Sequence, residues 1–278
     1  MIDEFLRTEI DLGSFPGASY AIGSSHEIER IGALGHAVVV PVRIPATVAT
    51  IYDCASVTKA VVTTTLVLQA VEEGRLSLEQ EFHGFPIERL LTHTSGLRAW
   101  MPLYADGDYL EQILAEGREY EAGTKVVYSD LNFVLLWYLL QETFGDYVAA
   151  ARERIFDRLG IAEDAMFNPP ASLLPRIAAT EFGQRFEVQK LAKRSHIDGA
   201  REGLMWGDAN DGNSWHHGGT AANAGLFATA RACYRIVQGW LDGTLVPRPL
   251  FELATRNHTA GLNENRGLGW QLRSENNR

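Results

Sequence analysis

The sequence predicts an α/β (α+β) protein in which a mainly helical segment is inserted into a sheet domain. Two strand-like runs lie near the N-terminus, at 18–23 and 31–40, and are rich in small and β-branched apolar residues. A long stretch of helical and irregular sequence follows them. Only the run at 268–272 then indicates a return to strands, so the order is strands, helices and strand.

The remaining elements follow from periodicity, capping residues and helix breakers. In chain order we expect a helix at 2–10, a short strand at 51–52, a helix at 56–73, a short helix ending at 91, an aromatic-rich loop at 97–110, helices at 131–143 and 147–159, a loop region at 168–215 and a helix at 230–242. Gly74 ends the helix at 56–73, because glycine readily adopts the left-handed conformation of the C′ position.

Composition narrows the class of protein. The 278 residues suffice for one large domain or two closely packed ones, and 35 acidic against 25 basic residues give a net charge of −10. No cluster of Lys and Arg opposes that charge, so we predict no nucleic-acid partner. No apolar stretch of about 20 residues is present, so we predict no membrane span. The N-terminus lacks the features of a signal peptide, so we expect a cytoplasmic protein, or a periplasmic or secreted one if a leader was removed.

Cysteine and histidine usage gives no sign of a disulfide framework or a metal. Cys54 and Cys233 are too few for a framework, and we interpret Cys54 as a small buried residue. Adjacent histidines in a strand point to opposite faces, and no His-x-x-x-His spacing supports zinc. We therefore predict no metal and no cofactor from the nearest candidates, which are His196, Asp208, Asp211, His216 and His217.

Ser56 precedes Lys59 by three residues at the start of the predicted helix at 56–73. Residues at i and i+3 share a helix face, so the Lys59 amine can reach the Ser56 hydroxyl. A serine becomes a nucleophile when a base takes its proton, and lysine is such a base only where burial or nearby positive charge lowers its pKa. The alternative is an ordinary N-cap serine followed by a solvated lysine.

Tyr128 and Asp130 form a second constellation at the start of the apolar helix. The tyrosine can act as a general base or proton relay beside positive neighbours. The alternative is a capped helix, with Asp130 as the N-cap and Tyr128 at the edge of the core. Trp100 and Tyr104 could line an acyl pocket, although an aromatic loop packed on the core accounts for them equally well.

Six segments in chain order carry a resemblance: ASVTK (55–59), EGRLSL (73–78), LLTHTSGL (90–97), AGTKVVYSD (122–130), GGTAANAGLFATA (218–230) and GLGWQL (267–272). They are similar to motifs of the penicillin-recognising serine hydrolases, in the branch of class C β-lactamases, D-amino-acid peptidases and β-lactamase-like carboxylesterases. The resemblance implies a β-lactamase/transpeptidase-like fold, with an antiparallel sheet flanked by helices and an inserted helical domain. Residues 1–55 and about 225–278 would form the sheet domain, and 56–224 the helical one.

The resemblance also implies roles for individual residues. Ser56 would be the acylated nucleophile, its backbone N–H would supply one oxyanion donor, and Lys59 and Tyr128 would share the proton transfers. Asp130 stands where Asn is commoner and would hold Lys59 or a substrate amide. An ionised Asp130 favours protonated Lys59, which shifts the base role toward Tyr128. His93 belongs to a scaffold segment, so we do not expect it to be catalytic.

One family motif is missing from the sequence. The family has Lys or His, a small residue and Gly on a strand after the Gly-Leu-Gly-Trp segment, and nothing after Gly269 matches it. His217 precedes two glycines and is the nearest substitute, as a substrate-binding group. We expect either that residues follow Arg278 or that the sheet is completed differently, for example by another subunit of a homo-oligomer.

The predicted function is hydrolysis of a small molecule through an acyl-enzyme on Ser56. The substrate would be a small carboxylic ester, or a β-lactam or D-amino-acid amide, and the late segments favour a carboxylesterase. The alternative is a catalytically weak relative that binds an acyl or peptidyl ligand or a partner chain. The missing motif and Asp130 are the reasons to keep that alternative.

Overall fold

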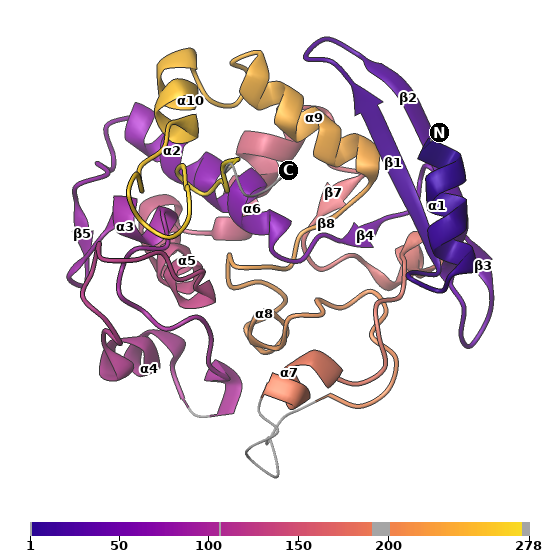
Figure 1. The fold of residues 1–278 in the computed structure, drawn as a ribbon, viewed down its shortest axis with the longest axis horizontal. Coiled ribbons are helices and arrows are strands. Elements are labelled where there is room, and N and C mark those ends of the chain that lie inside the picture. Colours follow the sequence, from indigo (N-terminus) through magenta and orange to yellow (C-terminus); the bar gives the residue numbers. More distant parts are fainter. Residues whose placement is uncertain (1, 106, 191–200, 274–278) are drawn as a thin grey trace.

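The computed structural model describes residues 2–105, 107–190 and 201–273 (Figure 1). One side of the molecule is an antiparallel sheet in the order β1-β2-β3, formed by Gly17–Gly23, Ile28–Val38 and Ile44–Pro45. Helix α1 (Ile2–Asp11) contacts β2, and helix α9 (Ala230–Leu241) contacts β1. The two predicted N-terminal strands and the helices at 2–10 and 230–242 are confirmed.

A second small sheet contains the strand that immediately precedes the predicted nucleophile, Ser56. Its antiparallel order is β4-β8-β7, formed by Tyr52–Asp53, Phe227–Ala228 and Ala165–Met166. Just after β4, the Cys54 N–H donates to the Leu226 carbonyl at 2.8 Å. The residues before Ser56 therefore lie against the segment that ends in β8.

The predicted helix at 56–73 is confirmed, with one irregularity. It opens with a wide π-helical segment over Lys59–Thr63 and continues as α2 (Thr64–Glu72). The Thr64 hydroxyl donates to the Lys59 carbonyl at 2.8 Å inside the wide segment. Gly74 follows the C-cap with φ +68°, the left-handed conformation expected of it.

Three further helices lie where they were expected: α3 (Ile87–Leu91), α5 (Asp130–Phe144) and α6 (Tyr147–Ala151). The elements that were not predicted are β5 (Glu81–Phe82), β6 (Phe85–Pro86), α4 (Tyr109–Glu116), α7 (Arg185–Lys190), α8 (Gly212–His216) and α10 (Arg248–Thr255). The predicted helix at 147–159 is α6 followed by a π-helical segment over Arg152–Asp157.

Two expectations were wrong. The region at 168–215 is not all loop, because α7 and most of α8 lie in it. The run at 268–272 forms no strand, and its one ladder contact is an isolated bridge between Arg266 and Gln271. Its apolar members lie against the helical core instead, where Leu268 is fully buried.

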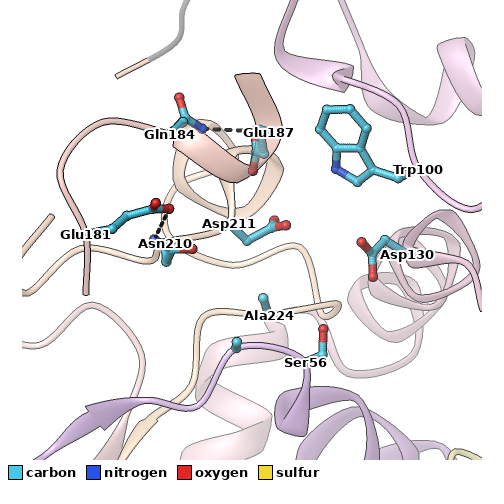
Figure 2. A pocket seen from close by; sticks show the side chains of 10 residues that line it. Ser56, Trp100, Asp130, Glu181, Gln184, Glu187, Asn210, Asp211 and Ala224 are labelled. Carbon is cyan, nitrogen blue, oxygen red and sulfur yellow. Dashed lines mark hydrogen bonds between the residues drawn. The ribbon is translucent and has the colours of Figure 1, made fainter. Parts of the chain in front are cut away.

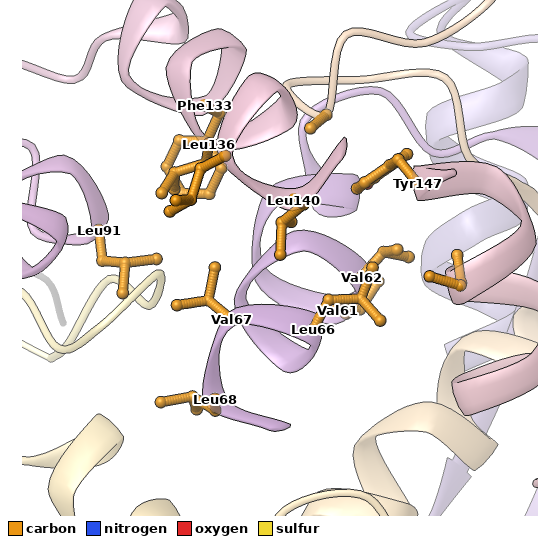
Figure 3. Close-up of a cluster of buried hydrophobic side chains, with 14 of the residues drawn as sticks. Val61, Val62, Leu66, Val67, Leu68, Leu91, Phe133, Leu136, Leu140 and Tyr147 are labelled. Carbon is orange, nitrogen blue, oxygen red and sulfur yellow. The ribbon is translucent and has the colours of Figure 1, made fainter. Parts of the chain in front are cut away.

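The core surrounds the helix that follows Ser56. Side chains of that helix pack on α5, with α3 and α6 closing the sides (Figure 3). The fully buried members include Val62, Leu66, Val67, Leu68, Leu91, Phe133, Leu136, Leu140 and Tyr147. A helix that is buried on all sides cannot shift without breaking this packing, so the core fixes the position of Ser56 and Lys59. Among the described residues, no helix is long and apolar enough to cross a membrane.

Cys54 and Cys233 come together although 179 residues separate them, with their Sγ atoms 3.8 Å apart. Both are free thiols and half-buried. A disulfide needs its sulfurs about 2.05 Å apart, so a small movement suffices to join them. We predict that glutathione disulfide converts the folded protein to a form lighter by two hydrogen atoms, measured by intact mass spectrometry. A Cys233→Ser control should instead retain a glutathione adduct, and a wild type that keeps two thiols would contradict the prediction.

Candidate active site

The turn before Ser56 has an unusual backbone conformation, which a hydrogen bond to Asp53 stabilises. Ala55 has φ 44°, a left-handed conformation that a non-glycine residue rarely adopts. The Ala55 N–H donates to Asp53 Oδ1 at 2.8 Å, which stabilises this conformation. Such backbone strain is concentrated at functional sites in proteins. The turn leaves the Ser56 side chain exposed at the start of a buried helix.

Lys59 lies directly beneath Ser56 and is only 2% exposed. Three oxygens surround its ammonium: Ser56 Oγ at 2.9 Å, the Asn223 carbonyl at 2.8 Å and Asp130 Oδ1 at 2.7 Å. An ammonium has three N–H groups, so this arrangement uses all of them. The structure thus excludes the solvated lysine that was the alternative for this pair.

The charge of Lys59 is set by two opposing effects. Burial lowers its pKa, but the Asp130 carboxylate and the Tyr128 phenol act the other way and together raise the pKa above its usual value. Lys59 is therefore protonated at neutral pH, which is the effect expected of an acid at position 130. In the resting site, the ammonium donates to Ser56 and cannot accept its proton.

Asp130 is the first residue of α5, and its side chain faces Lys59 with 17% exposed. The residue at the N-cap is Ser129, whose hydroxyl donates to the Arg98 carbonyl at 2.6 Å. The alternative in which Asp130 caps this helix is therefore wrong. Its carboxylate instead forms an ion pair with the buried Lys59.

Tyr128 stands over the same ammonium, with Lys59 Nζ 5.1 Å from its ring centroid. The guanidinium carbon of Arg266 lies 5.3 Å from that ring, so two cations flank the tyrosine. The ring is 40% exposed and packs on His93, with the centroids 4.5 Å apart. Tyr128 thus faces both the lysine and the solvent side of the site.

His93 is a buried support for this tyrosine. Its Nδ1 accepts the Ser129 N–H at 3.0 Å, which leaves the ring proton on Nε2. Burial, together with the charges of Arg266 and Lys59, lowers the pKa of His93 well below its usual range. A neutral imidazole at 1% exposure orients the start of α5, as the scaffold interpretation requires.

Ser56 opens into a cavity of about 140 Å³ (Figure 2). Its lining is Ala55, Ser56, Trp100, Asp130, Glu181, Gln184, Glu187, Asn210, Asp211 and Ala224. Of the predicted residues, the cavity brings together Ser56, Asp130 and Trp100. Tyr104 lies behind the wall, where its hydroxyl donates to Glu187 Oε2 at 3.0 Å.

His217 is not part of this cavity. Its Nδ1 lies 3.0 Å from the Thr220 carbonyl, and its ring packs on Trp137 with the centroids 4.3 Å apart. Burial lowers the pKa of His217, so its ring is neutral. The structure therefore gives this histidine a packing role and does not bring it to Ser56.

Most of the cavity wall was not predicted. Glu181, Gln184, Glu187 and Asn210 all come from the region at 168–215, which has no periodic pattern. The only signal was the polar run at 208–212, part of which had been weighed as a metal site. The described residues contain no group of His, Cys, Asp and Glu arranged for a metal, and His196 lies outside them.

A serine that opens into a cavity above a buried lysine, in this fold, defines a serine hydrolase of the β-lactamase/transpeptidase-like class. The sequence model of the Beta-lactamase family matches residues 2–278. The chain therefore belongs to the Beta-lactamase family, and the resemblance seen in its motifs is confirmed. An Escherichia coli protein with the provisional name D-alanyl-D-alanine carboxypeptidase is 26% identical over 315 residues, which cover 98% of this chain and 71% of that protein.

Solved structures share the fold. The D-amino acid amidase from Ochrobactrum anthropi, complexed with L-phenylalanine, has a TM-score of 0.75 at 21% identity and covers 98% of this chain and 81% of its own. The octameric penicillin-binding protein homologue from Pyrococcus abyssi has a TM-score of 0.71 at 19% identity over 96% of this chain. This chain spans 63% of the length of the Pyrococcus protein. These likenesses confirm the predicted fold.

The Asp130→Asn substitution tests the electrostatics of the site. Without the carboxylate, burial dominates and the pKa of Lys59 falls, so neutral lysine exists at lower pH. We predict that the pH dependence of Ser56 acylation by a fluorophosphonate moves to lower pH by about 1–3 units. Asp164→Asn, which removes a surface ion pair with Arg176, is the matched control and should leave the profile in place. An unmoved profile in Asp130→Asn would show that Lys59 does not titrate in this step.

Proposed function

We propose that this chain hydrolyses small amides or esters through an acyl-enzyme formed on Ser56. The observation that carries the proposal is the Ser56 hydroxyl, which faces a cavity and lies 2.9 Å from a buried lysine that Asp130 holds. Acyl transfer needs a serine whose proton has a place to go, a space for the carbonyl, and a positive field for the oxyanion. All three lie at the start of one helix.

The proton route passes through Lys59. Because Lys59 is an ammonium at rest, it first releases a proton to solvent, and the neutral amine then takes the proton of Ser56. The Lys59 ammonium donates to the Tyr128 phenol oxygen, which is one of the causes that raise the Lys59 pKa, and this contact connects the two residues. The alkoxide of Ser56 then attacks the carbonyl, and Tyr128 gives its proton to the departing amine or alcohol and takes one from Lys59. Water repeats the sequence to release the acid.

The oxyanion of the intermediate would face the Ser56 N–H at the helix start. That N–H and the helix dipole supply positive charge where the carbonyl oxygen becomes negative. Ala224 lines the same cavity close to Ser56 (Figure 2). The second donor is outside this proposal, because the family motif that carries it has no match among the described residues.

Amides stand beside esters as substrates because of the relatives. The names D-amino acid amidase and D-alanyl-D-alanine carboxypeptidase both describe cleavage of an amide bond. They support an amidase or peptidase as much as the carboxylesterase that the late motifs favoured. The rival function, a weakly active protein that binds an acyl ligand or a partner chain, predicts an unreactive Ser56.

A fluorophosphonate tests the nucleophile directly. We predict a single adduct on the wild-type protein, detected by intact mass spectrometry, because Lys59 and Tyr128 activate only Ser56. The Ser56→Ala variant should show none, and the exposed-serine control Ser14→Ala should react like wild type. A folded wild type without an adduct would favour the binding function instead.

The relay predicts that Lys59 and Tyr128 act as one unit. Lys59→Met and Tyr128→Phe should each slow labelling about 10²–10⁴-fold, the usual contribution of acid–base catalysis. Residues that act as a unit have non-additive effects, so the double variant should be no slower than the slower single variant. Stopped-flow or gel-based labelling rates measure this. Multiplied effects in the double variant would mean that the two residues act independently.

Two broader expectations stay proposals. The Pyrococcus homologue is octameric, which supports a homo-oligomer of this chain, to be measured by light scattering. The cytoplasmic location expected from the N-terminal sequence needs fractionation of cells that produce the protein.

A further inference from the structure

The cavity at Ser56 is strongly acidic. Four of its lining residues are carboxylates, Asp130, Glu181, Glu187 and Asp211, and no lysine or arginine lines it among the described residues. Figure 2 shows these acids on opposite sides of the same space. A neighbouring cavity of about 250 Å³ shares Ala55, Glu181 and Asn210 with it and adds Asp53. The space that a substrate must enter is therefore surrounded by negative charge.

Two cations lie near these acids, and neither occupies the cavity. Lys59 is committed to Asp130 and Ser56 beneath the floor. The Arg201 guanidinium donates to the Asn210 carbonyl at 2.6 Å and lies 4.7 Å over the Trp215 ring, outside the lining. Five carboxylates, with Asp53 included, thus face two cations in the described part of the site.

Asp211 has one oxygen that is bonded within the protein and one that faces the cavity. Its Oδ1 accepts the Ser214 N–H at 2.7 Å and the Asn223 side-chain amide at 3.1 Å. No hydrogen bond within the described residues reaches Oδ2, and the carboxylate points across the cavity toward Asp130 and Trp100 (Figure 2). Burial, and secondly the charge of Asp130, raise the pKa of Asp211.

Glu187 completes the acidic wall from α7. It is 7% exposed, its Oε1 accepts the Gly212 N–H at 2.7 Å, and its Oε2 accepts from Tyr104 and Gln184 at 3.0 Å each. Its partners are neutral donors, and burial raises its pKa to about 7. A buried carboxylate of this kind is stabilised by a cation that enters from the cavity.

Trp100 adds a surface suited to the same ligand. Its indole lines the cavity beside Asp130, Glu187 and Asp211. An ammonium within about 6 Å of an indole face is attracted by the ring quadrupole, more strongly where water is excluded. Carboxylates around one aromatic face are therefore suited to a substituted ammonium.

We propose that the cavity beside Ser56 binds an ammonium group of the substrate, with Asp211 and Glu187 as its charged partners. This inference rests on the proposed hydrolase function and names its substrate class. The preferred substrates are amides or esters with a free amine near the scissile carbonyl, such as simple amino-acid amides. The same acids repel a carboxylate, so N-acylated amino acids with a free carboxylate and penicillin-type acids bind poorly.

A matched pair of ligands tests the proposal. Phenylalanine amide carries the ammonium, and N-acetyl-phenylalanine amide lacks it but keeps the amide and the ring; both enantiomers are used. We expect wild-type kcat/KM to favour the free amine at least about ten-fold, the effect of about 1.4 kcal/mol. Asp211→Asn and Glu187→Gln should each lower this ratio of the two kcat/KM values about ten-fold. A change that affects both substrates equally does not alter the ratio. Glu142→Gln, an exposed acid on α5, is the control and should keep the wild-type ratio.

Binding of the same two amides by calorimetry separates this proposal from the hydrolase proposal. If the fluorophosphonate labels Ser56 but the acetylated amide binds as well as the free amine, the ammonium site is wrong and the hydrolase stands. If Ser56 is unreactive but the free amine binds selectively and Asp211→Asn removes that selectivity, the ammonium site stands alone. If wild type and Asp211→Asn have the same ratio of affinities for the free and the acetylated amide, Asp211 is not a partner of the ammonium.

The pH dependence gives a second readout of Glu187. This carboxyl faces Tyr104, Gln184, Asp211 and Arg201, and of these only Arg201 favours its ionised form by charge. With its pKa near 7, Glu187 loses its charge as the pH falls below that value. The α-amine of the ligand titrates in the same range, so the readout is the selectivity of wild type divided by that of Glu187→Gln at each pH. This quotient should fall between pH 8 and about 6 as Glu187 loses its charge. A quotient that does not change with pH would remove Glu187 from the site.

Discussion

The buried ammonium of Lys59 is the group on which the centre of this molecule depends. Burying a single charge costs several kcal/mol unless it is paired and hydrogen-bonded. Here the cost is offset because oxygens from three parts of the chain converge on it: Ser56 in the same helix, Asp130 at the start of α5 and the Asn223 carbonyl in the loop before β8. The relative placement of these segments is thus a condition for folding as well as for chemistry.

The surrounding structure keeps those three oxygens in place. The helix that carries Lys59 is packed on α5 through fully buried aliphatic side chains (Figure 3). On the other side, the Asn223 side chain accepts from the Ser214 hydroxyl at 3.0 Å and donates to Asp211. The Leu226 N–H donates to the Thr58 hydroxyl at 3.1 Å, which ties the same loop to the helix. Apolar packing positions one half of the site, and polar contacts position the other.

Asp53 joins the two halves. One of its oxygens accepts the N–H of Ala55 in the turn before Ser56, and the other accepts the Asn210 N–H at 2.7 Å. The strained turn and the acidic wall therefore share a single carboxylate. Because Asn210 precedes Asp211, a shift of this wall would be transmitted to the turn that presents the nucleophile.

Sequence reasoning found the parts of the site that depend on local geometry. The spacing of Ser56 and Lys59, the stop at Gly74 and the helix after Tyr128 all follow from short-range rules, and the structure has them. The scaffold role of His93 came from the family resemblance. Asp211 and Glu187 were not identified as ligand-binding residues, because long-range polar contacts in a region without periodicity place them there. The same limitation explains His217, whose neighbours Trp137 and Tyr109 are far from it in the sequence.

The π-helical opening at Lys59–Thr63 could not be predicted for a related reason. Every residue of that segment is compatible with an α-helix, and the wide turn is accompanied by contacts to distant parts of the chain. Thr63 donates to the Ala222 carbonyl at 2.7 Å and contacts the Tyr147 hydroxyl at 2.9 Å. The neighbouring Thr64 hydroxyl donates back to the Lys59 carbonyl. Wide turns of this kind are frequent at functional sites, and here one begins at the lysine itself.

The acidic cavity and the buried lysine are coupled through the same negative charges. The carboxylate of Asp130 raises the pKa of Lys59, and Asp211 lies close enough to Lys59 for each to influence the other's ionisation. A ligand ammonium placed against these acids would weaken their hold on the lysine proton and so lower the pKa of Lys59. By linkage, a lysine that has lost its proton would bind that ammonium more tightly. A cationic substrate would therefore favour the neutral lysine that Ser56 needs, whereas an uncharged analogue of the same shape would leave the ammonium in place.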